Sequence, residues 1–421
     1  MPEVVIVGAG AAGISAARYL HQHRIDVQVL EAATGVGGRA CTDHHFGFPI
    51  DLGAHWLHAP THNPLRPYLD TLGIDYATSA YATQYWQDNR WLSPAEQTQC
   101  THYIHQRFAA LAETARATDC AVSDQRVAAS PWQRAFTAEF INKQGANPHE
   151  VSALDFARYR WDSDDLPVHG GYGNLLSRLA PHAQIRCACA VRKITYSESN
   201  RIAIDSSLGT LSARAVIITV STGVLNSGSI EFTPALPLDI RTAIAALPLS
   251  HCNKVILPLR PDAATLTTRD LRLVPITGTG DGIEILIRPG GHPVVIGLVG
   301  GALGLELADA GSRAMVDALH QHLRMIFGAE VAGDFAANPR TIDWSHDPHV
   351  LGYVATPKPG DAGARQALSD PIDNRLFFAG EALSRDFMGD VHGAWVSGIE
   401  AATAAIVALK CRHSHAYAPA P

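Results

Sequence analysis

The chain has 421 residues, enough for two or three domains at the usual size of roughly 100–200 residues each. Apolar side chains make up 47% of it and charged ones only 17%, as is typical of globular proteins with large cores. The formal net charge of −7 gives no indication of a nucleic-acid partner, so we expect none.

The cysteines and the apolar runs bear on where the protein resides. The seven cysteines form no C-x-x-C pair, and their odd number argues for a reducing compartment. The first apolar strand begins at residue 4, which leaves no room for a targeting segment, so we expect a cytoplasmic protein. No uninterrupted apolar run approaches about 18 residues, so we expect no membrane anchor. No histidine pair has H-x-x-x-H spacing with a nearby acid on a predicted helix, and we expect no metal site.

A strand, a turn and a helix open the chain. The β-branched run Val4–Val7 predicts a buried parallel strand, and residues 14–23 predict a helix. The turn between them has the spacing G-x-G-x-x-G, in which the first glycine permits a tight bend, the second admits a pyrophosphate and the third lets the helix pack closely. We expect a dinucleotide at the N-terminus of this helix, whose free N–H groups attract phosphate. The candidate contacts are Gly8, Gly10, Ala12 and Gly13.

An acid and a second glycine run narrow the choice of dinucleotide. Glu31 ends a second apolar strand, residues 27–30, where a carboxylate can accept hydrogen bonds from ribose hydroxyls. A glutamate there repels a 2′-phosphate, so NADP is not expected. The run G-x-G-G-R at residues 35–39 resembles the second fingerprint of the amine oxidase branch of FAD enzymes. An arginine beside open backbone suits a phosphate or flavin contact. The candidate contacts here are Glu31, Gly37, Gly38 and Arg39.

The stretch D-L-G-A-H-W at residues 51–56 closely resembles polyamine oxidases and their relatives. The resemblance implies that the backbone here runs along the flavin, which explains the small side chains in its middle. His58 falls where many polyamine oxidases carry a histidine near the substrate amine, although it could also be a histidine hydrogen-bonded in a loop. The candidate flavin contacts are Gly53, Ala54, His55 and Trp56.

Residues 62–165 form the first of two insertions, which the resemblance assigns to the substrate-binding part. Helices are predicted over residues 65–72, 94–117 and 130–144. Ser130 is the expected N-cap of the last of these. An acidic cluster follows, and it could attract a polycation, although a solvated loop is the more ordinary interpretation; its members are Asp162, Asp164 and Asp165.

The next segment is expected in the FAD-binding domain, and the second insertion follows it. Within a strand predicted over residues 185–196, Val191 matches the family valine whose backbone reads the adenine ring. The second insertion carries Lys254 inside an apolar strand, where a lysine is costly unless it has a partner. In flavin amine oxidases a lysine on such a strand reaches flavin N5 through a water. Further strands are predicted over 283–287 and 294–299, and a helix over 312–327.

The last ninety residues resemble the part of the family that surrounds the flavin ring. Tyr353 takes the position of one wall of an aromatic cage. The residue before it is Gly352, where the mitochondrial monoamine oxidases carry the cysteine bonded to FAD, so we expect non-covalent FAD. The final helix begins near residue 390, and its N-terminal amides can stabilise negative charge on a reduced flavin. The candidate cofactor contacts are Gly380, Glu381, Asp390, Val391 and Ala394.

Asp390 departs from the family pattern, because monoamine and plant polyamine oxidases have the second cage tyrosine there. An aspartate cannot stack on an alkyl chain. It could pair with a cationic group of the substrate, or raise the pKa of the amine and hinder formation of the neutral amine that reacts. The substrate class therefore stays open at this position.

Together these motifs predict an α/β protein with a Rossmann-type (GR2-like) FAD-binding domain and an α+β substrate domain built from insertions. We expect the first domain at 1–61, 166–235 and 340–412, the second at 62–165 and 236–339, and a flexible tail at 413–421. The resemblance implies an FAD-dependent amine oxidase acting on a polyamine or related primary or secondary amine. Hydride would pass to flavin N5, the imine would hydrolyse, and O2 would be reduced to H2O2. The expected catalytic residues are Lys254, Tyr353, His58 and Asp390.

Three alternatives remain open on the sequence alone. A flavin desaturase or C–C dehydrogenase on the same fold would not need Lys254. An amino-acid oxidase needs an arginine for the substrate carboxylate, which the sequence does not place. A flavin-holding protein without activity would explain an aspartate at the cage. The electron acceptor and the oligomeric state are likewise not determined.

Overall fold

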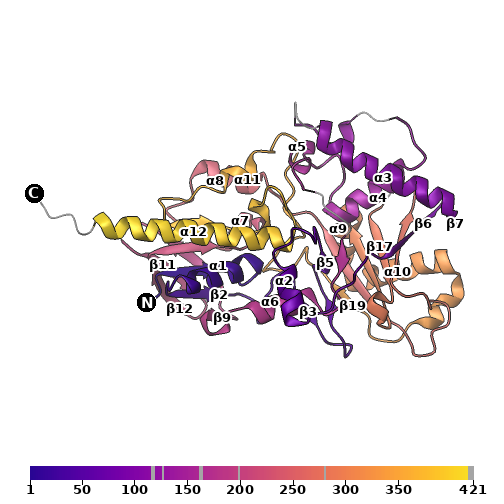
Figure 1. Ribbon diagram of the computed structural model, residues 1–421, viewed down its shortest axis with the longest axis horizontal. Helices are drawn as coiled ribbons and strands as arrows, with labels where there is room; N and C mark the ends of the chain where they lie inside the picture. Colours follow the sequence, from indigo (N-terminus) through magenta and orange to yellow (C-terminus); the bar gives the residue numbers. More distant parts are fainter. Residues whose placement is uncertain (115–118, 126–127, 161–164, 198–199, 279–280, 416–421) are drawn as a thin grey trace, which may run out of the picture.

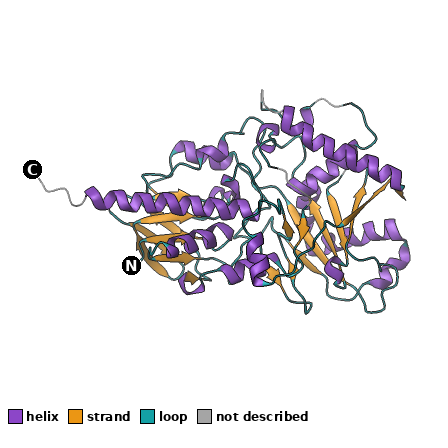
Figure 2. Ribbon diagram, viewed as in Figure 1, coloured by secondary structure: helices purple, strands orange, loops and turns teal. Residues whose placement is uncertain are grey.

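A computed structural model describes residues 1–114, 119–125, 128–160, 165–197, 200–278 and 281–415. The molecule is elongated and is built around two large sheets (Figures 1 and 2). A five-stranded parallel sheet lies towards the end that carries the N-terminus, and a seven-stranded sheet lies towards the opposite end. The predicted α/β class is confirmed.

The parallel sheet has the strand order β20-β13-β1-β2-β9. β1 is central and pairs in parallel with both β2 and β13, so it is buried on both faces, as its four-residue apolar run predicts. The first two strands begin and end where the sequence predicts. The bounds are β1 Val4–Val7, β2 Val27–Leu30, β9 Ile185–Arg186, β13 Ala215–Ile218 and β20 Leu376–Phe378.

Two helices cover one face of this sheet, α1 (Ala11–Gln22) and α12 (Val391–His415). α1 begins three residues before the predicted start. The helices approach closely at Gly398, where a Cβ atom would lie 2.1 Å from the carbonyl oxygen of Ala12. The apolar cluster between them and the sheet consists mainly of alanine and β-branched side chains, which explains the close packing.

α12 also meets the length and hydropathy criteria for a membrane-crossing helix over Val391–Cys411. Within that window 44% of the helix is buried inside the structure, and it packs along α1. Because a buried core helix meets the same two criteria, this helix is weak evidence for a membrane span. α12 continues to His415, so residues 413–415 of the predicted tail are helical, and 416–421 lie outside the described residues.

A four-stranded sheet of order β12-β11-β10-β14 lies beside the parallel sheet. The single strand predicted over residues 185–196 is wrong in its continuity: β9 joins the parallel sheet, β10 joins this one, and Ala188 between them has a left-handed φ of 51°. The bounds are β10 Val191–Thr195, β11 Ile202–Ser206, β12 Gly209–Ala213 and β14 Glu231–Thr233.

The seven-stranded sheet has the order β19-β15-β18-β17-β16-β6-β7 and all of its pairings except β16–β6 are antiparallel. β17 and the helix α10 (Ser312–Phe327) match the predicted bounds, and β18 ends one residue later than predicted. β19 pairs with β15, although the predicted boundary places residues 340–342 in the other domain. The bounds are β6 Ala82–Gln87, β7 Arg90–Trp91, β15 Cys252–Pro258, β16 Leu271–Ile276, β17 Ile283–Ile287, β18 Val294–Gly300 and β19 Arg340–Ile342.

Alternation along the strands gives this sheet two apolar faces. Val255 and Leu257 pack with the helices α9 and α10, whereas Val274 and Ile276 pack with α3, α4 and α5.

The start of α4 differs from the prediction: its N-cap is Trp132, and Ser130 accepts the Trp132 N–H at 3.2 Å. The bounds are α3 Pro94–Thr114, α4 Gln133–Gln144, α5 Ala153–Phe156, α9 Gly301–Ala310 and α10 Ser312–Phe327.

Shorter elements connect the sheets. α8 packs in the core of the parallel sheet, although the predicted boundary assigns it to the substrate part. The remaining helices are α2 Arg66–Leu72, α6 Tyr172–Leu179, α7 Thr222–Asn226, α8 Leu238–Ala245 and α11 Ala364–Ala367, and the remaining strands are β3 Thr42–Asp43, β4 Ile50–Asp51, β5 Trp56–Leu57 and β8 Leu166–Pro167.

Candidate active site

The glycine turn after β1 has no room for a side chain at two of its positions, Gly8 and Gly13. Gly8 has a φ of 106°, and a Cβ on Gly13 would lie 2.0 Å from the Gly8 carbonyl oxygen. At Gly10 the nearest atom to such a Cβ is 3.9 Å away, so the space beside it is open. Ala12 lies in the first turn of α1, whose N-cap Gly10 has no side-chain hydrogen bond. The turn therefore presents free N–H groups to an anion.

Glu31 ties the end of β2 to this turn. One carboxylate oxygen accepts the Ala9 N–H at 2.6 Å and the other accepts the Ala33 N–H at 2.8 Å. The side chain is 8% exposed. Since each oxygen has a second lone pair, Glu31 can still accept a ribose hydroxyl, and that role stays a prediction.

The second glycine run lies directly against the first. Gly37 bridges to Gly10, and with a φ of 111° its Cβ would lie 2.3 Å from the Ala40 carbonyl oxygen. Gly38 also has a positive φ, of 58°. Gly37 is buried and Gly38 is exposed, so the run lies beside the glycine turn at the carboxyl edge of the parallel sheet, where ligands bind in such folds.

Arg39 and Glu381 meet at this edge. Nη1 of Arg39 donates to Oε1 of Glu381 at 3.0 Å and also to the carbonyl oxygen of Tyr353. The other oxygen, Oε2, is buried and has no hydrogen-bond partner among the described residues. A cavity of about 340 Å³, measured out to its opening, is lined by Arg39, Gly380 and Glu381 together with the ends of β13 and β20.

The other predicted cofactor contacts surround this edge. Val191 is buried at the start of β10. Val391 and Ala394 lie in the first turn of α12 and pack with α1 and α6. Val191 packs on the sheet face of Val5 and Val7, and Ala394 on the face of Val4 and Ile6, and the individual cofactor contacts stay predictions.

Lys254 projects from β15 towards the loop after β4. Alternation along β15 places it on the face of Ile256, which packs against Ile50, and away from α10. Its Nζ donates to the carbonyl oxygens of Asp51 at 2.6 Å and Gly53 at 2.9 Å. Burial lowers the pKa of Lys254 to about 8, although the Asp51 carboxylate opposes this shift. Two N–H groups are thus used, and a third remains for a water or a ligand.

The loop that receives Lys254 is closely packed. A Cβ on Gly53 would lie 1.9 Å from the Arg39 carbonyl oxygen, and Ala54 donates its N–H to the same oxygen. Nδ1 of His55 lies 3.2 Å from the Gly53 carbonyl oxygen, while its Nε2 is buried without a partner among the described residues. Burial holds the pKa of His55 well below its usual value. Its ring is therefore neutral.

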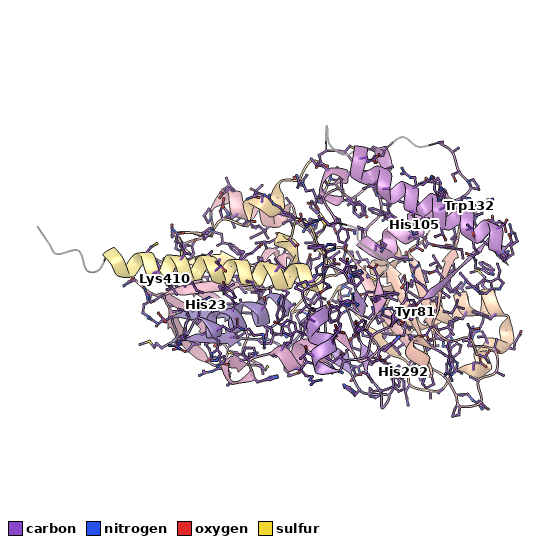
Figure 3. The ribbon with its side chains drawn as sticks, viewed as in Figure 1. His23, Tyr81, His105, Trp132, His292 and Lys410 are labelled. Atoms are coloured by element: carbon purple, nitrogen blue, oxygen red, sulfur yellow. The ribbon has the colours of Figure 1, made fainter. Side chains whose placement is uncertain are left out.

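Trp56 begins β5, which pairs with β8, and its side chain packs against the seven-stranded sheet. Its ring lies 5.1 Å from that of Tyr81 in an edge-on arrangement, and Tyr81 is labelled at the sheet in Figure 3. This aromatic contact anchors the loop against the second sheet.

His58 lies between two carboxylates. Its Nδ1 is 2.8 Å from Oδ1 of Asp165, and its Nε2 is 3.8 Å from Oδ1 of Asp390. Asp165 also pairs with Lys143 at 3.2 Å. Burial favours a neutral ring, but the two carboxylates outweigh it and raise the pKa of His58 to about 9. His58 is therefore charged at neutral pH, and it lies in the loop after β5, where it is hydrogen-bonded to Asp165.

Asp165 corrects the interpretation of the acidic cluster as a solvated loop. The side chain is 25% exposed and holds His58 and Lys143. Burial opposes ionisation, but these two cations hold the pKa of Asp165 well below its usual range. Asp162 and Asp164 lie outside the described residues.

Asp390 is buried at the N-terminus of α12. The Tyr159 hydroxyl donates to its Oδ2 at 2.6 Å, and Nδ1 of His392 lies 3.7 Å from the same oxygen. Burial raises the pKa of Asp390 to about 6, against the charge of His58 and the Tyr159 hydrogen bond. The carboxylate is ionised at neutral pH, and its Oδ1 faces His58.

Tyr353 lies near Asp390 and the cofactor edge. Burial first, and then negative charges that include Asp390, raise the pKa of its phenol, so it stays neutral. At Gly352 the φ is 143° and a Cβ would lie 2.4 Å from the Leu249 Cβ. Since no side chain fits, residue 352 offers no atom for a covalent bond to FAD.

Three residues of this site were not predicted. Lys143 lies on α4 and Tyr159 in the loop after α5, both in the first insertion, while His392 follows Asp390 on α12. None stands in a recognisable motif. Only the contacts made by the fold bring them to Asp165 and Asp390.

Comparisons with known proteins agree with this geometry. The chain matches the profile of the flavin containing amine oxidoreductases over residues 11–91 and 86–406. It is 31% identical over 436 residues to polyamine oxidase 2 of Arabidopsis thaliana, an alignment that covers 95% of this chain and 87% of that protein. It is 30% identical over 440 residues to polyamine oxidase 4 of Oryza sativa subsp. japonica, with coverage of 95% and 88%.

The chain belongs to the flavin-containing amine oxidase family. The solved structure of cyclohexylamine oxidase from Brevibacterium oxydans IH-35A has the same fold, with a TM-score of 0.81 over 97% of this chain and 99% of that one, at 24% identity. The family member described here is therefore an FAD-dependent oxidoreductase that acts on amines.

The residues at the carboxyl edge of the parallel sheet fit FAD. The glycine turn leaves open space beside Gly10 at the uncapped end of α1, which suits a pyrophosphate. The unpartnered Oε2 of Glu381 can accept a hydroxyl of the ribityl chain. Arg39, which holds the other oxygen of Glu381, supplies positive charge beside the same cavity.

Proposed function

We propose that this amine oxidase acts on a polyamine or a related primary or secondary amine. The observation that carries the proposal is the pair of carboxylates, Asp165 and Asp390, on either side of His58. A polyamine carries several cations, and Oδ1 of Asp390 lies 3.8 Å from Nε2 of His58 and accepts no hydrogen bond from the described residues. The 30–31% identity to two polyamine oxidases supports the same substrate class.

The Asp390 carboxylate can pair with a substrate nitrogen that stays protonated during the reaction. A carboxylate whose pKa is about 6 stabilises an alkylammonium group but is too weak a base to deprotonate it. The nitrogen that reacts must be neutral, so it should lie away from Asp390, on the side of Lys254 and Tyr353. FAD bound at the sheet edge would accept a hydride from the carbon beside that nitrogen, leaving an imine that water hydrolyses.

The protein's own groups have distinct parts in this proposal. Lys254 would hold a water with its third N–H and, with a pKa near 8, can exchange a proton with it at neutral pH. The neutral ring of Tyr353 would support the reacting carbon. His58, fixed by Asp165, would keep the Asp390 carboxylate ionised. We propose O2 as the electron acceptor, with H2O2 as its product.

Anaerobic titration tests the substrate class. We would add spermine, spermidine, putrescine, simple monoamines and amino acids separately to the FAD-loaded enzyme, and follow the oxidised flavin band at about 450 nm. Bleaching by polyamines at lower concentrations than by monoamines is the expected result. If monoamines or amino acids bleach the band equally well, the polyamine assignment is wrong. Asp390→Asn should weaken the binding of polyamines more than that of monoamines.

A further inference from the structure

A second cavity lies between α3 and α4, away from the cofactor edge. These helices lie at the end of the molecule opposite the N-terminus (Figure 1), and Trp132, just before α4, lies opposite Lys410 in Figure 3. The cavity measures about 480 Å³ out to its opening, with open solvent included. None of the residues that line it belongs to the candidate active site.

Arg107 is the unusual feature of this cavity. Its side chain is 6% exposed, and its Nε is buried without a hydrogen-bond partner among the described residues. The guanidinium lies 4.8 Å above the ring of Phe136, which gives it one cation–π contact. The cation–π contact gives none of the five N–H donors of the guanidinium a hydrogen-bond acceptor. A buried charge without a counterion is costly. Burial accordingly lowers the pKa of Arg107.

The surroundings favour negative charge. Gln133 also lines the cavity; its Oε1 accepts the Tyr103 hydroxyl at 2.6 Å, which leaves its amide N–H groups to donate. His149 stands at the exposed rim. Gln133 and Phe136 lie in the first turn of α4, so the positive end of the helix dipole adds to the charge of Arg107.

No carboxylate among the described residues lines the cavity. The two nearest acids in sequence are engaged elsewhere. Asp124 accepts the Ala121 N–H at 3.3 Å, and Glu150 accepts the Asn147 N–H at 2.8 Å. Among the described residues Arg107 forms no ion pair, and an anion bound in the cavity would supply its counterion.

We propose that this cavity binds a small oxyanion, a carboxylate or a phosphate, through the guanidinium of Arg107. The planar fork of a guanidinium matches both groups with two parallel hydrogen bonds. The site is separate from amine oxidation, and the proposal stands whether or not the substrate is a polyamine.

The test uses the FAD-loaded enzyme with inorganic phosphate in one arm and succinate in the other, at constant ionic strength set with chloride. Calorimetry and thermal unfolding should show saturable binding of at least one of the two anions, because a ligand that binds only the folded state raises Tm with concentration. In Arg107→Met the dissociation constant should rise at least about tenfold, as expected for loss of a charge-assisted contact. Oxidation of amines should not change.

Two results would overturn the proposal. Absence of saturation with both anions would show that no such site exists. An equal rise of Tm in wild type and Arg107→Met would show only the general stabilisation that excluded salts produce. If Arg107→Met does not fold, Arg107→Lys replaces it, since lysine keeps the charge but loses the fork; binding as tight as in wild type would then exclude the assigned contact.

Discussion

The two sides of the active site are built in different ways. The cofactor side consists of backbone: two glycine runs within forty residues of the N-terminus, packed so that added Cβ atoms overlap carbonyl oxygens. The substrate side consists of charged and polar side chains from separate segments, which meet around His58 and Asp390. The first side should therefore fail when its shape changes, and the second when its charges change.

The largest effect is expected on the cofactor side. In Gly13→Ala the new Cβ would lie 2.0 Å from the Gly8 carbonyl oxygen, so helix and strand must separate. We expect the free energy of unfolding to fall by about 3 kcal/mol or more, because overpacked backbone cannot yield as a flexible side chain does. Urea unfolding and the ratio of FAD to protein measure this.

Gly35→Ala is the matched control within the second glycine run. A Cβ at Gly35 has no atom within 4 Å, so its stability should change by no more than about 0.5 kcal/mol. Equal losses in the two variants would show that the steric argument is wrong.

Lys254 joins the two sides and gives the next largest effect. Lys254→Met removes the donor that would hold a water, and we expect anaerobic reduction by the best amine to slow by about 100-fold, the lower range for proton-transfer groups. Stopped-flow absorbance measures the rate. Lys193→Met, which removes an exposed lysine paired with Glu231, should leave the rate unchanged. A Lys254→Met enzyme at full rate would show that Lys254 has no part in amine oxidation.

The same contrast explains what could be predicted from sequence. Gly8, Gly13 and Gly37 stand in a short motif because their geometry is local, and the structure shows the close contacts that the spacing predicts. Lys254 could also be predicted, since a charge inside an apolar strand is conspicuous. Its acceptors, the carbonyl groups of Asp51 and Gly53, lie some two hundred residues earlier.

The residues around His58 could not be predicted in the same way. Asp165 is surrounded by other acids in the sequence and resembles a solvated loop, and nothing local marks Lys143 or Tyr159 as its neighbours in space. The split between β9 and β10 was missed for a related reason. The apolar pattern continues through residues 187–190, which separate the two strands, and Ala188 among them has a left-handed φ. Such features depend on tertiary packing, which overrides local pattern.

The charge of His58 gives the third prediction. Its pKa is about 9 in the folded protein and 6.5 when unperturbed, so its contribution to stability is complete below pH 6.5 and is lost as pH rises through 9. Asp165→Asn removes its closest partner, and we expect a loss of about 2 kcal/mol at pH 6.5, typical of a hydrogen bond between charged groups. Urea unfolding between pH 6 and 10 should show this difference shrink.

Lys143 limits how far the stability difference between wild type and Asp165→Asn falls at high pH. It also pairs with Asp165 and stays charged at pH 9, because its pKa is raised by Asp165 and Glu139 despite burial. A part of the difference should therefore remain at pH 10. Asp262→Asn, at an exposed pair with Arg260, should cost little at any pH. A difference independent of pH would argue against a charged His58.

Asp390 gives the smallest effect, and its direction separates function from stability. Burial raises its pKa from 3.8 to about 6, so the folded protein holds the proton more tightly than the unfolded chain. The stabilising contribution is therefore present below pH 3.8 and is lost as pH rises through 6. In Asp390→Asn the side chain cannot ionise, and its oxygen can still accept a hydrogen bond from the Tyr159 hydroxyl. The attraction between the carboxylate and His58 is lost.

We expect a net gain of about 1 kcal/mol in unfolding free energy at pH 8 and none at pH 4, together with weaker binding of polyamines. Urea unfolding at the two pH values and anaerobic titration with spermine measure the two effects. A loss of stability at pH 8 would mean that the pair with His58 outweighs the cost of burying the carboxylate. A gain in stability together with weaker polyamine binding would mean that the carboxylate at residue 390 serves the substrate, because the fold is more stable without its charge.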